Sequence, residues 1–124
     1  MSLSTLGLIL LSISLSALAQ VLLKFGMSSD SVKQALAGGS PASAALAVFL
    51  STRVLGGLSL YGFGAVFWLG VLSRTEISKA YPFVGLGFVL TALIGYFVFG
   101  DSLGPLRISG IALVILGTFL ILRS

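Results

Sequence analysis

The chain has 124 residues, of which 57% are hydrophobic and 8% are charged, and its formal net charge is +4. A mean hydropathy of +1.19 lies far above that of an ordinary soluble domain and indicates a protein whose solvent is a lipid bilayer. The chain contains no cysteine, no histidine and only three acidic residues, so it offers no disulfide, no metal site and no catalytic triad. We therefore expect neither an enzyme nor a cofactor-binding protein.

Four apolar stretches are each long enough to cross a membrane, because a helix needs about 20 apolar residues to span a hydrocarbon core of about 30 Å. They cover about residues 3–27, 54–73, 77–100 and 105–122. Backbone amides in lipid must be paired within a segment, and the alternating pattern of a β-barrel is missing. The expected fold is an all-α bundle of four transmembrane helices that forms one domain over residues 1–124.

The first helix carries a polar residue at every fourth position, namely Ser12, Ser16, Gln20 and Lys24. At about 100° per residue, these positions share an arc of about 120° and form a polar stripe. Gln20 would lie about 7 Å from the membrane midplane and Lys24 about 14 Å from it. The amide therefore needs a partner inside the bundle. The lysine could extend to the headgroups or bind a lipid phosphate. The serines could have no role beyond hydrogen bonds to backbone carbonyls or to neighbouring helices.

The start of the chain has a second interpretation, because Ala17-Leu18-Ala19 resembles the cleavage site of a signal peptide. However, the basic n-region is missing and the apolar run is longer than usual, so a membrane span is favoured.

The connection after the first span contains a further apolar run near 41–52 that is too short to cross a membrane. Ser40 and Pro41 precede it with the pattern of an N-cap and a first helical residue. We expect an interfacial helix there, or an extension of the second span, held near the membrane surface by Arg53.

Aromatic and kink-prone residues mark the second and third helices. Trp68 lies deep enough in the second helix that its indole N–H needs a hydrogen-bond partner, and its side chain could line a cavity. The third helix begins with Ala80-Tyr81-Pro82, followed by Gly85 and Gly87. Because proline removes a backbone hydrogen bond and glycine permits bending, Pro82, Gly85 and Gly87 are a candidate hinge. Tyr81 could also be an ordinary aromatic residue of the membrane interface.

Two glycines of the fourth helix, Gly110 and Gly117, are one heptad apart. Small residues on one seam permit close helix packing, so these positions are candidates for contact with a second subunit, or for packing within the bundle.

The seven cations are scattered around the membrane ends, which argues against nucleic-acid binding. Apart from Lys24, the side shared by both termini carries Arg74, Lys79 and Arg123, and the other side carries Lys33, Arg53 and Arg107. This balance gives no positive-inside bias. Such a chain is either simply hard to orient from its sequence or able to insert both ways, as in inverted-topology transporter pairs. Because four helices can hardly enclose a sizeable substrate, we expect a homodimer, or a heterodimer with a four-helix paralogue.

Three stretches resemble, in order and spacing, the four-helix members of the drug/metabolite transporter superfamily: LSALAQVLLKFGM, YGFGAVFWLGVLSRTEISKAYPF and GDSLGPLRISGIALVILGTFLI. They look most like the EamA-like subunits of the aminoarabinose-phosphoundecaprenol flippase, which share Q-x-x-x-K at the end of the first helix and A-Y-P at the start of the third. The small multidrug resistance exporters are less similar. Those exporters have a glutamate where this chain has Ser16, which argues against proton-coupled export of cations by this chain alone.

The resemblance implies a lipid flippase of the bacterial inner membrane, whose substrate is an anionic lipid such as an undecaprenyl phosphate-linked sugar. In that case Lys24 would contact the phosphate, and Gln20 and Tyr81 the phosphate or sugar. Trp68 would shape the cavity, and Ser16 would occupy the position of the exporters' glutamate. No nucleotide-binding motif is present, so movement would follow gradients or downstream consumption of the substrate, and not ATP hydrolysis by this chain. Two alternatives stay open: a metabolite or drug permease that uses a partner's carboxylate, and a membrane assembly subunit that does not transport.

Overall fold

The computed structural model describes residues 2–124, and within that range the chain is helical and contains no strand. Four helical segments are long and apolar enough to cross a membrane: Leu3–Met27 (α1), Thr52–Leu72 (α4), Ile77–Phe99 and Pro105–Arg123 (α7). Their ends lie within two residues of the predicted ones, so the predicted all-α fold with four membrane-spanning helices is confirmed.

The long first connection forms two short helices, α2 (Asp30–Gly38) and α3 (Pro41–Leu50). At the start of α3, the side chain of Ser40 accepts a hydrogen bond of 3.2 Å from the backbone N–H of Ser43. Ser51 then leaves helical geometry, with φ −66° and ψ 122°, and caps α4. The short helix near 41–52 is therefore present and separate from the second span, whereas α2 was not predicted.

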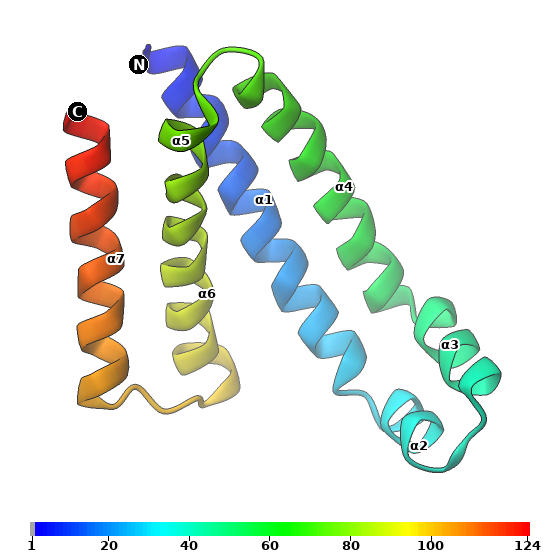
Figure 1. Cartoon of the computed structure of the whole chain (residues 1–124). Coiled ribbons are helices and arrows are strands. Elements are labelled where there is room, and N and C mark those ends of the chain that lie inside the picture. The colour runs from blue at the N-terminus through cyan, green and yellow to red at the C-terminus, as the bar shows by residue number, and fades with distance from the viewer. Residues whose placement is uncertain (1) are drawn as a thin grey trace.

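The helices run up and down, so that both termini lie at one end together with the turn between α4 and α5 (Figure 1). The opposite end carries α2, α3 and the connection between the third span and α7. α1 packs against α4 on one side and against the third span on the other, and α7 packs mainly against the third span.

Small residues bring α1 and α4 close together. A Cβ added at Gly57 would lie 2.8 Å from Cγ of Leu23, and one added at Gly64 would lie 3.3 Å from the carbonyl oxygen of Ser12. The Ser12 hydroxyl also donates a hydrogen bond of 2.7 Å to the carbonyl oxygen of Gly64. Because lipid provides no hydrophobic force between helices, such close packing and hydrogen bonding hold the pair together.

The third span is interrupted at its proline. It consists of α5 (Ile77–Ala80), a 3₁₀ turn η1 (Tyr81–Phe83) and α6 (Val84–Phe99). The Thr118 hydroxyl of α7 donates to the carbonyl oxygen of Val114 at 2.8 Å and reaches that of Pro82 at 3.4 Å. Gly85 also lies close to Val114, since an added Cβ would be 2.8 Å from Cγ1 of Val114. A 3₁₀ turn inside a helix often marks a hinge, and a hinge at Pro82 stays a prediction.

The outer helix α7 packs loosely. Thr118 is its only buried residue in the described chain. A Cβ added at Gly110 or Gly117 would meet nothing within 4 Å. These two glycines therefore face open space in the single chain, and their role in subunit contact or bundle packing stays a prediction.

Candidate functional site

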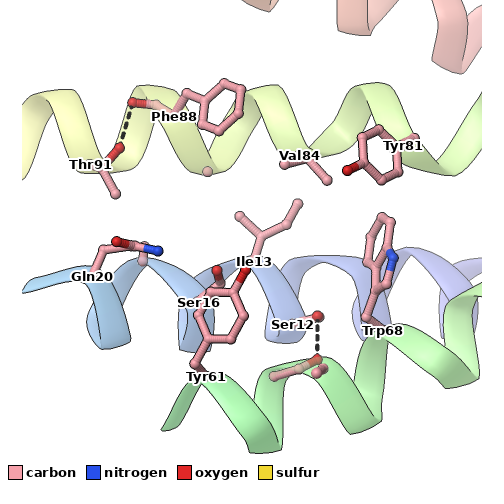
Figure 2. A pocket seen from close by; sticks show the side chains of 14 residues that line it. Ser12, Ile13, Ser16, Gln20, Tyr61, Trp68, Tyr81, Val84, Phe88 and Thr91 are labelled. Carbon is pink, nitrogen blue, oxygen red and sulfur yellow. Dashed lines mark hydrogen bonds between the residues drawn. The ribbon is translucent and has the colours of Figure 1, made fainter. Parts of the chain in front are cut away.

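A partly open cavity of about 570 Å³ lies between α1, α4 and the third span (Figure 2). Small-molecule sites usually have volumes of about 300–1,000 Å³. The cavity brings together Ser16, Gln20, Trp68 and Tyr81, four of the five residues singled out as substrate-binding candidates.

α1 contributes its polar stripe, but the members of the stripe differ in what they do. Ser12 is buried and its hydroxyl is engaged by Gly64 of α4. Gln20 is exposed and makes no hydrogen bond to another side chain or to the backbone within residues 2–124. The intrabundle partner expected for its amide is therefore not found, because the residue faces an open cavity and not a packed interface. That amide is left available for a ligand or water.

α4 contributes Tyr61, Gly64, Ala65 and Trp68, which lie on one face of the helix at intervals of three, four and seven residues. Figure 2 shows the Tyr61 ring rising from α4 toward Ser16. Tyr61 was not predicted. Its spacing of seven residues from Trp68 is a helical repeat that could have identified it.

The third span contributes Tyr81, Val84, Gly87, Phe88 and Thr91, again along one face. Thr91 was not predicted, although it continues the face that Tyr81 begins. Its hydroxyl donates a hydrogen bond of 2.9 Å to the carbonyl oxygen of Phe88, and its oxygen can still accept one from a ligand. Gly87 gives α1 room, since an added Cβ would lie 3.2 Å from Cγ2 of Ile13.

Trp68 and Tyr81 close one end of the cavity. Their rings meet edge to face, with centroids 6.2 Å apart and an interplanar angle of 72°. Figure 2 places this pair at one end and Gln20 with Thr91 at the other. Aromatic pairs in this geometry attract each other beyond the effect of their burial. The pair therefore borders the cavity at the end nearer the chain termini, while the polar end lies toward the opposite membrane surface.

Lys24 does not line the large cavity. It lines a second, smaller cavity of about 180 Å³, together with Gln20, Thr91 and Asp101. Because Gln20 and Thr91 border both cavities, the two cavities adjoin at these polar side chains, with Trp68 at the far end of one and Lys24 in the other. Asp101 was not predicted as a site residue.

The two cavities differ in what they can bind. The large one offers hydroxyl and amide groups among apolar side chains, and no charged side chain of residues 2–124 lines it. The small one offers an ammonium and a carboxylate. Together they suit an elongated ligand with a hydrogen-bonding body and a charged end.

Several known proteins are similar in sequence to this chain. No family model matches the chain, and no solved structure matches it. The chain is 38% identical over 116 residues to the probable 4-amino-4-deoxy-L-arabinose-phosphoundecaprenol flippase subunit ArnE of Pseudomonas fluorescens, and the match covers 94% of this chain and 95% of that protein. The protein of the same name from Pseudomonas savastanoi is 42% identical over 62 residues, which are 50% of this chain and 54% of that protein. The Proteus mirabilis protein is 35% identical over 63 residues, 51% of this chain and 56% of that protein. These names describe transport and not catalysis.

Proposed function

The chain belongs to the ArnE family of flippase subunits, and from this we propose that it is part of a transporter for a polyprenyl-phosphate-linked aminosugar. It is a multi-pass protein of the bacterial inner membrane, with four helices of membrane-spanning length and composition. The substrate class rests on the names of its relatives and on the cavity described above.

The pair of adjoining cavities is the observation that carries the proposal. A sugar presents several hydroxyl groups, and the large cavity presents hydrogen-bonding side chains from three helices: Ser16, Gln20, Tyr61, Tyr81 and Thr91. Apolar lining between these groups would exclude water, which strengthens each hydrogen bond. The polyprenyl tail would remain in the bilayer beside the helices, because its transfer out of lipid would be strongly unfavourable.

Lys24 supplies the positive charge that a lipid phosphate needs. It lies in the last turn of α1, close to the membrane surface, where an ammonium can stay hydrated. A phosphate bound there would place its sugar toward Gln20 and Thr91, which border both cavities. The headgroup would then pass along the path between them during transport.

Export of a cation by this chain alone is disfavoured. Such a substrate needs an acidic group in its cavity, and the large cavity is lined by no acid within the described residues. Ser16 occupies the position at which a glutamate would serve that purpose.

We further propose that the transporter contains two such subunits, either identical or paralogous, in contact through α7. The support is the exposure of α7 and the open space above Gly110 and Gly117. Close approach of a second helix along these glycines would bury apolar surface that the single chain leaves uncovered.

The proposal is tested by purifying the protein from inner membranes with any associated subunit and measuring its bound lipids by native mass spectrometry. We expect a polyprenyl-phosphate aminosugar to be retained, and Gln20→Leu to lower its occupancy. Gln34→Leu, an exposed position in α2, is the matched control and should not change it. If the purified protein carries no more polyprenyl phosphate than the bulk membrane does, the proposed function is wrong.

A further inference from the structure

The small cavity holds two opposite charges. Lys24 comes from the end of α1, and Asp101 comes from the connection between α6 and α7. The other two acids, Asp30 and Glu76, border neither cavity. Asp101 is thus the one acid of this chain that a ligand in the proposed site would meet.

Local backbone geometry directs Asp101 toward this cavity. Gly100 ends α6 in the left-handed region, with φ +72°, a conformation that glycine adopts without strain. The chain then folds back, and the backbone N–H of Asp101 donates a hydrogen bond of 3.0 Å to the carbonyl oxygen of Gly95. The Asp101 carboxylate lies over Gly95, where an added Cβ would be 2.5 Å from Oδ2. A side chain at position 95 would displace the carboxylate.

The Asp101 side chain is exposed and accessible to a ligand. The C-terminal end of a helix carries partial negative charge, and Asp101 lies against the last turns of α6. Asp101 has no ion-pair partner, since no side-chain ion pair is formed within residues 2–124. Arg107, the cation nearest to it in the sequence, donates instead to the carbonyl oxygen of Ser102 at 2.6 Å. The carboxylate is therefore exposed, forms no ion pair with residues 2–124, and can bind a cationic group of a ligand.

We propose, building on the function above, that Asp101 binds the ammonium group of the substrate's sugar while Lys24 binds its phosphate. The aminosugar phosphate proposed above carries both charges, and each of these two side chains would bind one of them. A headgroup with both charges would satisfy both side chains, which share one small cavity without pairing with each other. A neutral sugar phosphate would satisfy Lys24 alone and leave the carboxylate uncompensated, so Asp101 would act as a specificity residue.

The test compares two lipids that bind to the purified transporter in nanodiscs: a polyprenyl-phosphate aminosugar, and the same lipid with its amine acetylated. Acetylation removes the positive charge and keeps the phosphate. We expect the wild-type protein to prefer the amine by about tenfold, the contribution of one charge-assisted hydrogen bond. Asp101→Asn should abolish this preference by weakening the amine lipid only. Lys24→Gln should weaken both lipids.

Two further variants separate charge from structure. Gly95→Ala leaves the carboxylate in the chain but displaces it, and it should also reduce the preference for the amine. Asp30→Asn removes an exposed acid in α2 and should change nothing. If the wild-type protein binds both lipids equally, or if Asp101→Asn keeps the preference, the role of Asp101 is refuted while lipid binding still supports the proposed function. If the wild-type protein binds neither lipid, the proposed function itself fails and the role of Asp101 fails with it.

Discussion

The hydroxyl of Ser12 donates a hydrogen bond of 2.7 Å to the carbonyl oxygen of Gly64, and this bond joins α1 to α4 at the wall of the large cavity (Figure 2). The polar stripe of α1 therefore serves two purposes. Ser12 holds the cavity's wall together, whereas Ser16 and Gln20 face its interior. Lys24 continues the stripe into the small cavity.

Ser12→Ala is expected to lower the free energy of unfolding by about 0.6 kcal/mol, and by at most about 1.7 kcal/mol, which is the range for hydrogen bonds between membrane helices. The loss should appear in denaturant unfolding of the protein in micelles. Ser109→Ala is the control, because the Ser109 hydroxyl is exposed and bonds only to its own helix, at Pro105. Equal stabilities of the two variants would show that the bond between α1 and α4 does not contribute.

Tyr61→Phe is expected to reduce affinity for the lipid headgroup by about 2- to 10-fold, through loss of one hydrogen bond. Its ring would remain, so the cavity should keep its shape. Tyr96→Phe is the matched control, since Tyr96 lies outside both cavities and meets Phe97 edge to face, with ring centroids 5.0 Å apart. The affinity for the headgroup is measured with the protein in nanodiscs. An unchanged affinity in Tyr61→Phe would show that Tyr61 is not part of the site.

Pro82→Ala is expected to slow transport without lowering stability. Alanine would restore a regular helix through the 3₁₀ turn at Tyr81–Phe83, because it supplies the missing N–H and removes the ring clash. Loss of the turn should reduce bending at the glycines that follow, Gly85 and Gly87. Hydrogen exchange of the amides from 83 to 87 reports the local change. Pro41→Ala, at the first position of α3, should leave transport unchanged. Full transport by Pro82→Ala would argue against the hinge.

Replacing both Gly110 and Gly117 with leucine is expected to shift the protein from dimers to monomers, since bulky side chains would prevent close approach of a second α7. Cross-linking in native membranes measures the population of dimers. Gly62→Leu is the control, because Gly62 of α4 likewise has open space around an added Cβ. Dimers that persist in the double variant would place the subunit contact elsewhere.

The spans could be predicted from the sequence because the bilayer imposes a strict requirement on length and hydropathy. α2 was missed because it is a short, polar helix, for which the membrane gives no such signal. The stripe on α1 was recognised from its four-residue spacing. The same periodicity would have identified Tyr61 from Trp68 on α4, and Thr91 from Tyr81 along the third span.

Asp101 could not be placed from the sequence. The stretch from Gly100 to Pro105 indicates a turn, but it does not say toward which side the carboxylate points. That direction depends on the left-handed backbone at Gly100 and on the absence of a side chain at Gly95, five residues earlier on the helix. The division between a large neutral cavity and a small charged one likewise depends on how the chain packs, because three separate segments line each cavity.

Photoaffinity labelling tests most directly whether the headgroup occupies the cavity between α1, α4 and α6. A polyprenyl-phosphate aminosugar with a photoreactive group on its sugar is photolysed with the protein in nanodiscs, and the adducts are mapped by peptide mass spectrometry. We expect adducts at Tyr61, Trp68 and Thr91 that unlabelled lipid suppresses. Phe97 and Leu113, which are 77% and 68% exposed, should remain unlabelled. Adducts at Phe97 and Leu113 without enrichment in the cavity would contradict the proposed site.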